Sequence, residues 1–157
     1  MIKFTVFVFV FLTFWATDVQ ACLCDISFKH VDRQVKKAKE HATAVFTGRI
    51  VDIIDTKDPE GKPNGGIEAI LEVSEVWKGE ISGRVSVFTN KDGGTCGYDF
   101  VQGKEYLVYA YVDTYAKDML MTHLCTRTTI AEGKYYLKER KYLGKPLLKL
   151  EKGVKKG

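Results

Sequence analysis

The residues that could do chemistry begin with two cysteines, Cys22 and Cys24, placed directly behind an apolar leader. Residues 2–16 are almost wholly apolar, and the three residues before Cys22 have the small-x-small form of a cleavage site. This layout is typical of a signal peptide over residues 1–21, and the apolar run is too short for a transmembrane anchor. Cleavage after Ala21 would make Cys22 the first residue of a secreted, extracellular chain and give it a free α-amino group.

The sequence holds four cysteines in all, Cys22, Cys24, Cys96 and Cys125. An even number in a secreted chain favours disulfide bonds. Cys22 and Cys24 do not bridge each other comfortably, because side chains two residues apart in an extended segment run parallel. Two pairings therefore remain open: Cys22–Cys96 with Cys24–Cys125, or the swapped pair. Four thiolates around a zinc ion are an alternative, but zinc sites usually carry closely spaced cysteine pairs, and neither Cys96 nor Cys125 has a cysteine nearby.

Composition indicates one globular domain. Removing residues 1–21 from the 157 leaves 136, a size that suits a single core. The formal net charge of +4 suits anionic surfaces such as extracellular matrix or acidic glycans, but it is too weak to indicate nucleic acid. No second long apolar run follows the leader, so we expect no transmembrane segment. We expect the secreted chain to be a monomer.

Hydrophobic periodicity predicts a mainly β domain over residues 22–144, followed by a basic flexible tail over 145–157. Helices are expected at residues 31–44 and 130–143, and strands at 45–54, 67–77, 84–89, 105–112 and 119–124. Gly48 is a candidate bulge in the first strand, and residues 55–66 form a long polar turn. Five strands with a helix at each end favour a small closed Greek-key barrel over a sandwich.

Five short motifs carry a resemblance to a known family: Cys22-x-Cys24, Val76-Trp77-Lys78-Gly79, Thr95-Cys96-Gly97-Tyr98, Gly103-Lys104-Glu105-Tyr106-Leu107 and Cys125-Thr126-Arg127-Thr128. Together they resemble the netrin-like domain and, within it, the N-terminal inhibitory domain of the tissue inhibitors of metalloproteinases. The resemblance covers residues 22–144, and its most specific part is the terminal Cys-x-Cys combined with Cys-Gly-Tyr. It implies a five-stranded OB-fold barrel and selects the disulfides Cys22–Cys96 and Cys24–Cys125.

The resemblance also implies a mechanism. The α-amino nitrogen and carbonyl oxygen of Cys22 would chelate the catalytic zinc of a matrix-metalloproteinase-like enzyme, while the Leu23 side chain enters its specificity pocket. An amine and a carbonyl on one residue form a five-membered chelate, and a catalytic zinc keeps an open position for such ligands. The protein would need no cofactor of its own. The residues expected to contact the proteinase are Cys22, Leu23, Cys24, Asp25, Thr95 and Cys96.

Two other functions use the same cysteines. A netrin-like module could serve adhesion or matrix binding, with Cys22 acting only as a disulfide partner. Acylation of Cys22 would make a lipoprotein and would block the amine, although Gln20 stands where a lipidation signal needs a small residue.

No arrangement for catalysis is visible. The three histidines, His30, His41 and His123, are scattered singly, and the cysteines are expected to be paired. We therefore expect the protein not to be an enzyme. The tyrosines of strand 105–112 could form a binding face, but core packing is the simpler interpretation.

Overall fold

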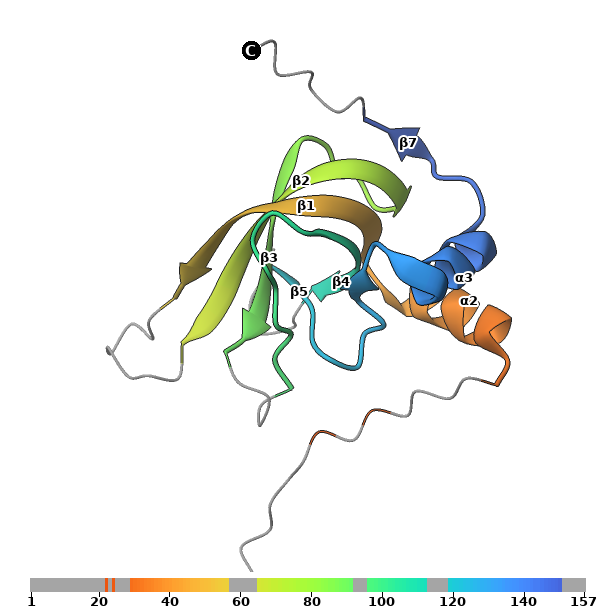
Figure 1. Cartoon of the computed structure of the whole chain (residues 1–157), viewed down its shortest axis with the longest axis horizontal. Coiled ribbons are helices and arrows are strands. Elements are labelled where there is room, and N and C mark those ends of the chain that lie inside the picture. The colour runs from red at the N-terminus through yellow and green to blue at the C-terminus, as the bar shows by residue number, and fades with distance from the viewer. Residues whose placement is uncertain are drawn as a thin grey trace, which may run out of the picture.

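The computed structural model describes residues 22, 24, 29–56, 65–91, 96–112 and 119–150. These residues form a mainly β domain with two helices, α2 (Val31–His41) and α3 (Gly133–Leu143), which lie side by side in Figure 1. The seven strands are β1 (Ala44–Asp55), β2 (Gly66–Lys78), β3 (Arg84–Asn90), β4 (Glu105–Val112), β5 (Leu120–Met121), β6 (Thr129–Ile130) and β7 (Leu148–Lys149).

Five of the strands close into a ring. β1 pairs with both β2 and β4, β2 pairs with β3, and β4 pairs with β5, all antiparallel. The ring closes between β3 and β5, which run parallel and are registered at Phe88 opposite Met121. The order around the ring is therefore β1-β2-β3-β5-β4, and β6 and β7 are attached outside it, to β4 and β2.

Several predicted elements are confirmed and others are corrected. β4 has the predicted bounds, and α2 has the predicted start but ends at His41, three residues early. The fifth strand, predicted over 119–124, covers only Leu120–Met121, because beyond Met121 the segment is joined to β4 by the Thr122 side chain and not by backbone pairing. α3 begins at Gly133 because Ile130 pairs with Tyr106 in β6. Residues 148–149, expected in a flexible tail, pair with β2 in β7.

Gly48 lies at a bulge in β1, as predicted. The pairing of β1 with β2 shifts register between Thr47 and Gly48. A β-carbon at Gly48 would approach both the carbonyl oxygen of Glu72 and the β-carbon of Leu71 to 3.1 Å. Because the neighbouring strand comes this close, the position favours glycine, and the bulge bends β1.

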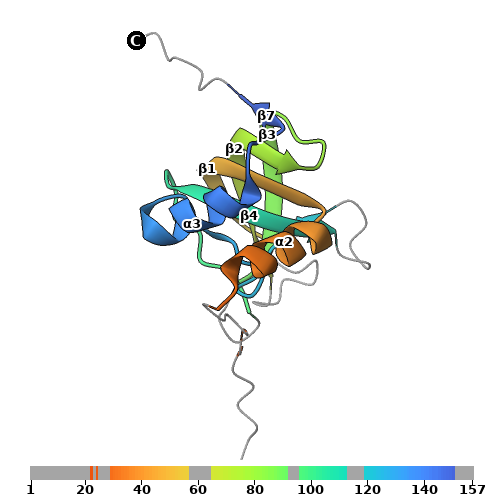
Figure 2. The ribbon, with the colours of Figure 1, turned by 90° about the vertical axis from the view of Figure 1, so that its right-hand side faces the viewer.

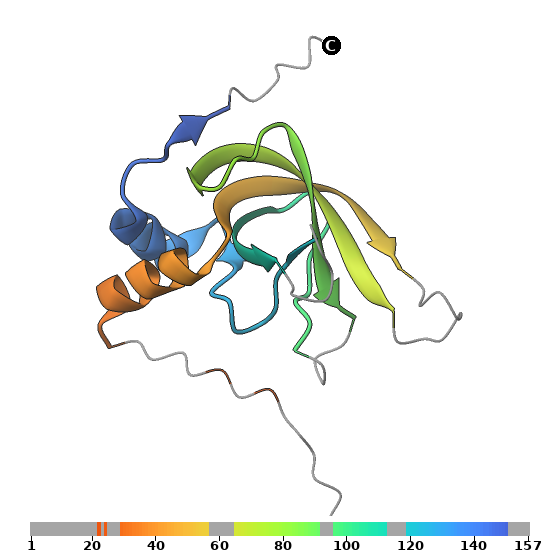
Figure 3. The ribbon, with the colours of Figure 1, turned by 180° about the vertical axis from the view of Figure 1, so that it is seen from behind.

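Two apolar clusters hold the domain together. The first fills the ring and includes Phe46, Leu71 and Val108, all fully buried. The second lies between the ring and the helices, where Val35 of α2 packs with Trp77. Figure 2 shows both helices in front of β1 and β4, and Figure 3 shows the ends of β1 and β2 extending away on the opposite side.

The segment Trp77-Lys78 joins both helices to the ring. The Trp77 indole Nε1 donates a hydrogen bond to the carbonyl oxygen of Gly144, which ends α3, at 2.9 Å. The Lys78 ammonium donates to the carbonyl oxygens of Lys39 and Glu40 in the last turn of α2, at 2.9 and 2.8 Å. These carbonyls have no acceptor role inside the helix and carry the negative end of its dipole. The Trp-Lys motif is therefore structural.

We expect Lys78→Met to destabilise the protein by about 1 kcal/mol, because it removes both hydrogen bonds to the end of α2. The midpoint of urea unfolding should fall, with an unchanged dependence on denaturant concentration. Lys36→Met is the matched control, because Lys36 is an exposed lysine on α2. It should leave the midpoint of unfolding equal to that of the wild type. Equal midpoints for Lys78→Met and Lys36→Met would contradict this role.

Candidate functional site

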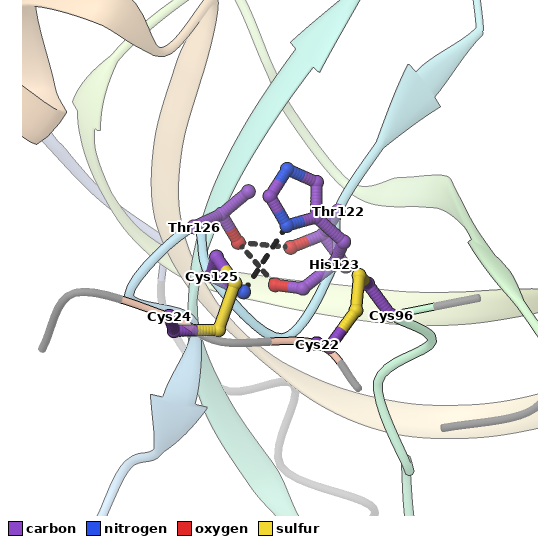
Figure 4. Close-up of a disulfide and its surroundings, with 7 residues drawn as sticks. All are labelled: Cys22, Cys24, Cys96, Thr122, His123, Cys125 and Thr126. Carbon is purple, nitrogen blue, oxygen red and sulfur yellow. Dashed lines mark hydrogen bonds between the residues drawn. A yellow bond between two sulfur atoms is a disulfide. The ribbon is translucent and has the colours of Figure 1, made fainter. Parts of the chain in front are cut away.

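The two disulfides define the candidate site. Cys22 is bonded to Cys96 and Cys24 to Cys125, with Cα–Cα distances of 5.6 and 5.1 Å. This is the pairing implied by the family resemblance, and it leaves no free thiol among the four cysteines to bind zinc. Figure 4 shows the two bonds side by side, beneath the loop that carries Thr122, His123 and Thr126.

The disulfides attach residues 22 and 24 to two neighbouring segments that are distant in sequence. Cys96 follows β3, whereas Cys125 lies between β5 and β6. The two segments touch directly, because the Leu124 amide donates a hydrogen bond of 2.9 Å to the carbonyl oxygen of Cys96. The bonds close loops with sequence separations of 74 and 101 residues, and each contributes about 4–5 kcal/mol in the chain-entropy model.

Three threonine hydroxyls anchor the loop that carries Cys125. Thr122 Oγ1 shares hydrogen bonds of 2.7 Å with the hydroxyls of both Thr126 and Thr128. Thr122 also donates to the carbonyl oxygen of Tyr109 at 3.2 Å, and the Tyr109 amide donates to Thr128 Oγ1 at 3.1 Å. The loop is thus bonded to β4 through side chains where the strand pairing has ended, which makes Cys125 a fixed attachment point.

His123 supports the same loop. Its Nδ1 accepts a hydrogen bond of 3.1 Å from the Cys125 amide, and its ring meets Tyr111 edge to face with centroids 5.5 Å apart. Burial lowers the pKa of His123 below its ordinary value, which favours the neutral ring. A neutral ring can accept at Nδ1, whereas protonation at that atom would remove the bond to Cys125.

Behind the loop lies a buried ion pair between Arg127 and Glu139 of α3. The Glu139 side chain is 0% exposed and also accepts a hydrogen bond of 3.0 Å from the Tyr109 hydroxyl. Arg127 donates further to Gln34 of α2 at 2.7 Å and to the Tyr135 hydroxyl at 3.1 Å. Burial alone would lower the pKa of Arg127, but Glu139 outweighs it and raises the pKa. Burial, followed by the Glu139 charge, raises the pKa of Tyr109. The cluster ties both helices to the disulfide loop.

Backbone conformation around the site is unusual. Cys96 and Arg127 both have left-handed φ angles, 62° and 69°. Such a conformation costs a residue other than glycine about 1–3 kcal/mol and persists where surrounding contacts enforce it. Here those contacts are the Cys22 disulfide and the Leu124 amide for Cys96, and the Glu139 pair for Arg127.

Three of the expected site residues, Leu23, Asp25 and Thr95, lie outside the described residues. So do residues 1–21, which are expected to form a signal peptide, and most of the expected polar turn. The structure does bring Cys22, Cys24 and Cys96 together at one edge. It also adds Leu124, a residue that the sequence did not single out: it is 42% exposed, and its backbone amide donates a hydrogen bond to the carbonyl oxygen of Cys96. Its only signal in the sequence is its position beside Cys125.

Tyr106 and Tyr109 of β4 are buried, which confirms that these two belong to the core, whereas Tyr111 is half-buried. Among the described residues, no group of three or more histidine, cysteine, aspartate or glutamate side chains could hold a metal ion. Within the same ranges, neither helix has the length and apolar character needed to cross a membrane. No protein-family model matches the sequence, and no curated protein matches it.

Proposed function

We propose that this protein is a secreted inhibitor of zinc metalloendopeptidases whose mature chain begins at Cys22. The Cys22 α-amino nitrogen and carbonyl oxygen would chelate the catalytic zinc of the enzyme and displace its bound water, with Leu23 in the specificity pocket. The proposal places the chain in the netrin-like domain family, with residues 22–144 as an inhibitory domain of the kind found in tissue inhibitors of metalloproteinases.

The observation that carries the proposal is the double attachment of residues 22 and 24. A zinc ligand at a chain terminus binds tightly only if it is held in place beforehand, because ordering it on binding would cost free energy. Two disulfides on alternating residues supply that order, and their partners Cys96 and Cys125 belong to segments that are hydrogen-bonded to each other.

The ring of strands supports the family assignment. A five-stranded Greek-key barrel is the OB-fold, and the ring β1-β2-β3-β5-β4 contains five strands with one parallel contact. We propose that this ring is an OB-fold barrel. In that arrangement the loops after β3 and β5 lie at one end of the barrel, which is where the disulfides attach the terminus.

The surface beside the terminus has the character of a protein contact. Leu124, next to Cys125, is 42% exposed, and interfaces bury such apolar side chains at their centre. We propose that a bound proteinase covers Leu124.

The direct test is an assay of the purified, secreted protein against a panel of zinc endopeptidases, after N-terminal sequencing and intact mass. A chain that starts at a free Cys22, holds two disulfides and inhibits at least one enzyme stoichiometrically supports the proposal. A free Cys22 without inhibition of any enzyme would favour a netrin-like adhesion or matrix-binding module. An acylated Cys22 would identify a lipoprotein and exclude chelation.

We expect Leu23→Gly to weaken inhibition of a sensitive proteinase by about 2–3 kcal/mol, the value of burying a leucine side chain in an apolar pocket. The melting temperature should hardly change. Leu147→Gly is the matched control, because Leu147 is 77% exposed and follows α3, away from the disulfides. Inhibition constants that are the same for Leu23→Gly and the wild type would show that the terminus does not enter the cleft of the enzyme.

A further inference from the structure

A cleft of about 580 Å³ lies beside the Cys24–Cys125 disulfide, bounded by α2, β4 and residues 123–127. Its volume is in the range of about 300–1,000 Å³ that small-molecule sites occupy. The wall supplied by α2 carries Gln34, Lys37, Ala38 and His41, which recur at spacings of three and four and so share one face of the helix. This face of α2 is too polar to belong to the apolar core, and it is not fully exposed to solvent.

The charges around the cleft have one sign. Lys37 and His41 lie exposed on α2, and Arg127, which is hydrogen-bonded to Gln34 of the same helix, also lines the cleft. No carboxylate lines the cleft among the residues that the structure describes. The charge of Arg127 is balanced by Glu139 behind it, so the attraction for an anion comes mainly from Lys37 at the rim.

Arg127, which lines the cleft, has one hydrogen-bond donor available. A guanidinium has five N–H groups. In Arg127, Nε and both hydrogens of Nη2 are engaged by Glu139 and Tyr135, and Nη1 donates once to Gln34. One N–H of Nη1 therefore has no partner among the described residues, and it belongs to a side chain that is only 10% exposed. A bound anion would satisfy it.

The remaining surface is apolar and aromatic. Ala38, Ala42 and Ala110 contribute only methyl groups, which leaves the space open. Tyr111 and His123 form an aromatic wall, with their rings held edge to face. A ligand with a flat apolar body and a negative charge at one end would therefore match both parts of the cleft.

We propose that this cleft binds a small organic anion, a carboxylate carrying an aromatic or other apolar body, with the carboxylate toward Lys37 and Arg127 and the body against Tyr111 and His123. This site is separate from the proposed zinc-chelating terminus, and the proposal does not depend on inhibition of a proteinase.

The test is a titration of the intact, ¹⁵N-labelled, disulfide-bonded protein with sodium benzoate, followed by backbone amide NMR. Benzyl alcohol serves as the uncharged ligand of the same shape. We expect saturable shifts of the amides of Ala38, Ala42, Tyr111 and Thr126 with benzoate, and clearly weaker shifts with benzyl alcohol. Lys37→Glu should weaken benzoate binding about three- to tenfold, the effect of reversing one exposed ion pair.

Lys36→Glu is the matched control, because Lys36 is exposed on the same helix but does not line this cleft. It should bind benzoate like the wild type. His41→Glu provides a second exposed substitution on the cleft side and should act like Lys37→Glu. Equal binding by Lys37→Glu and wild type, equal losses in Lys36→Glu and Lys37→Glu, or an equal response to benzyl alcohol would each overturn the proposal. So would the absence of saturable shifts at the four named amides.

Discussion

Adding a single alanine before Cys22 is expected to abolish inhibition of a sensitive zinc endopeptidase while leaving the fold intact. A zinc ligand must offer a lone pair, and the extension turns the α-amine of Cys22 into an amide, which has none to give. The new amine belongs to the added alanine, which no disulfide holds in place, so the terminus would have to be ordered on binding and would be displaced from the zinc. We expect the inhibition constant to rise by more than about three orders of magnitude, which corresponds to about 4 kcal/mol.

The controls for this experiment follow from the structure. The extension does not alter the two disulfides or either apolar cluster, so intact mass and melting temperature should match the wild type. Acetylation of the Cys22 amine should have the same effect as the extension, and an alanine added after Gly157 should have none. Inhibition at wild-type strength by the alanine-extended chain would rule out chelation through the terminus.

The same mechanism has a pH dependence of known sign. An α-amine has an ordinary pKa of about 7.7–8.0 and must lose its proton before it can bind zinc. Inhibition should therefore weaken about tenfold for each pH unit below that range, once the pH dependence of the enzyme itself has been subtracted.

The second large effect is expected at the buried ion pair. Arg127→Met should destabilise the protein by about 3–5 kcal/mol, because it leaves the carboxylate of Glu139 fully buried without a counter-charge. The hydroxyls of Tyr109 and Tyr135 would remain as hydrogen-bond donors to Glu139, but neutral donors do not replace a guanidinium. Urea unfolding measures the loss directly.

Two further variants separate a buried charge from lost packing. The double variant Arg127→Met/Glu139→Leu removes both charges and should recover much of the stability, since replacing a buried pair by apolar groups is often close to neutral. Glu132→Gln breaks the exposed Lys104–Glu132 pair and should cost less than about 1 kcal/mol. If Arg127→Met and Glu132→Gln destabilised the protein equally, Glu139 would not carry an unpaired buried charge after the removal of Arg127.

The parts of the fold that could be predicted are those with a strong repeating pattern. β4 was located residue by residue because its aromatic and β-branched side chains are bounded by glycine and polar residues on either side. The apolar stripe of α2 was also found, since Val31 and Val35 recur at helical spacing and are buried. Strands of two residues, such as β6 and β7, are too short to show an alternating hydrophobic pattern. They are therefore defined only by the strands with which they pair.

The candidate site, like the fold, could be predicted only in part. The disulfide pairing followed from the resemblance, because the residues themselves left two pairings open. Nothing in the sequence indicated that Glu139 is buried, because a glutamate in a helix rich in lysine and arginine is expected to be exposed to solvent. Its partner Arg127 lies 12 residues earlier, across the loop after Cys125, and only the folded chain brings the two together. The cleft was missed for the same reason, since its walls come from three separate elements.

The long sequence separation of the Cys24–Cys125 bond has a consequence for biosynthesis. Cys24 is made early, but the residue that fixes it is synthesised 101 positions later. At about 5–20 residues per second, the segment around Cys24 waits about 5–20 seconds before its partner exists. The segment that is made first can therefore be fixed at Cys22 once Cys96 exists, but oxidation can complete its attachment only after β1 to β5 have been produced.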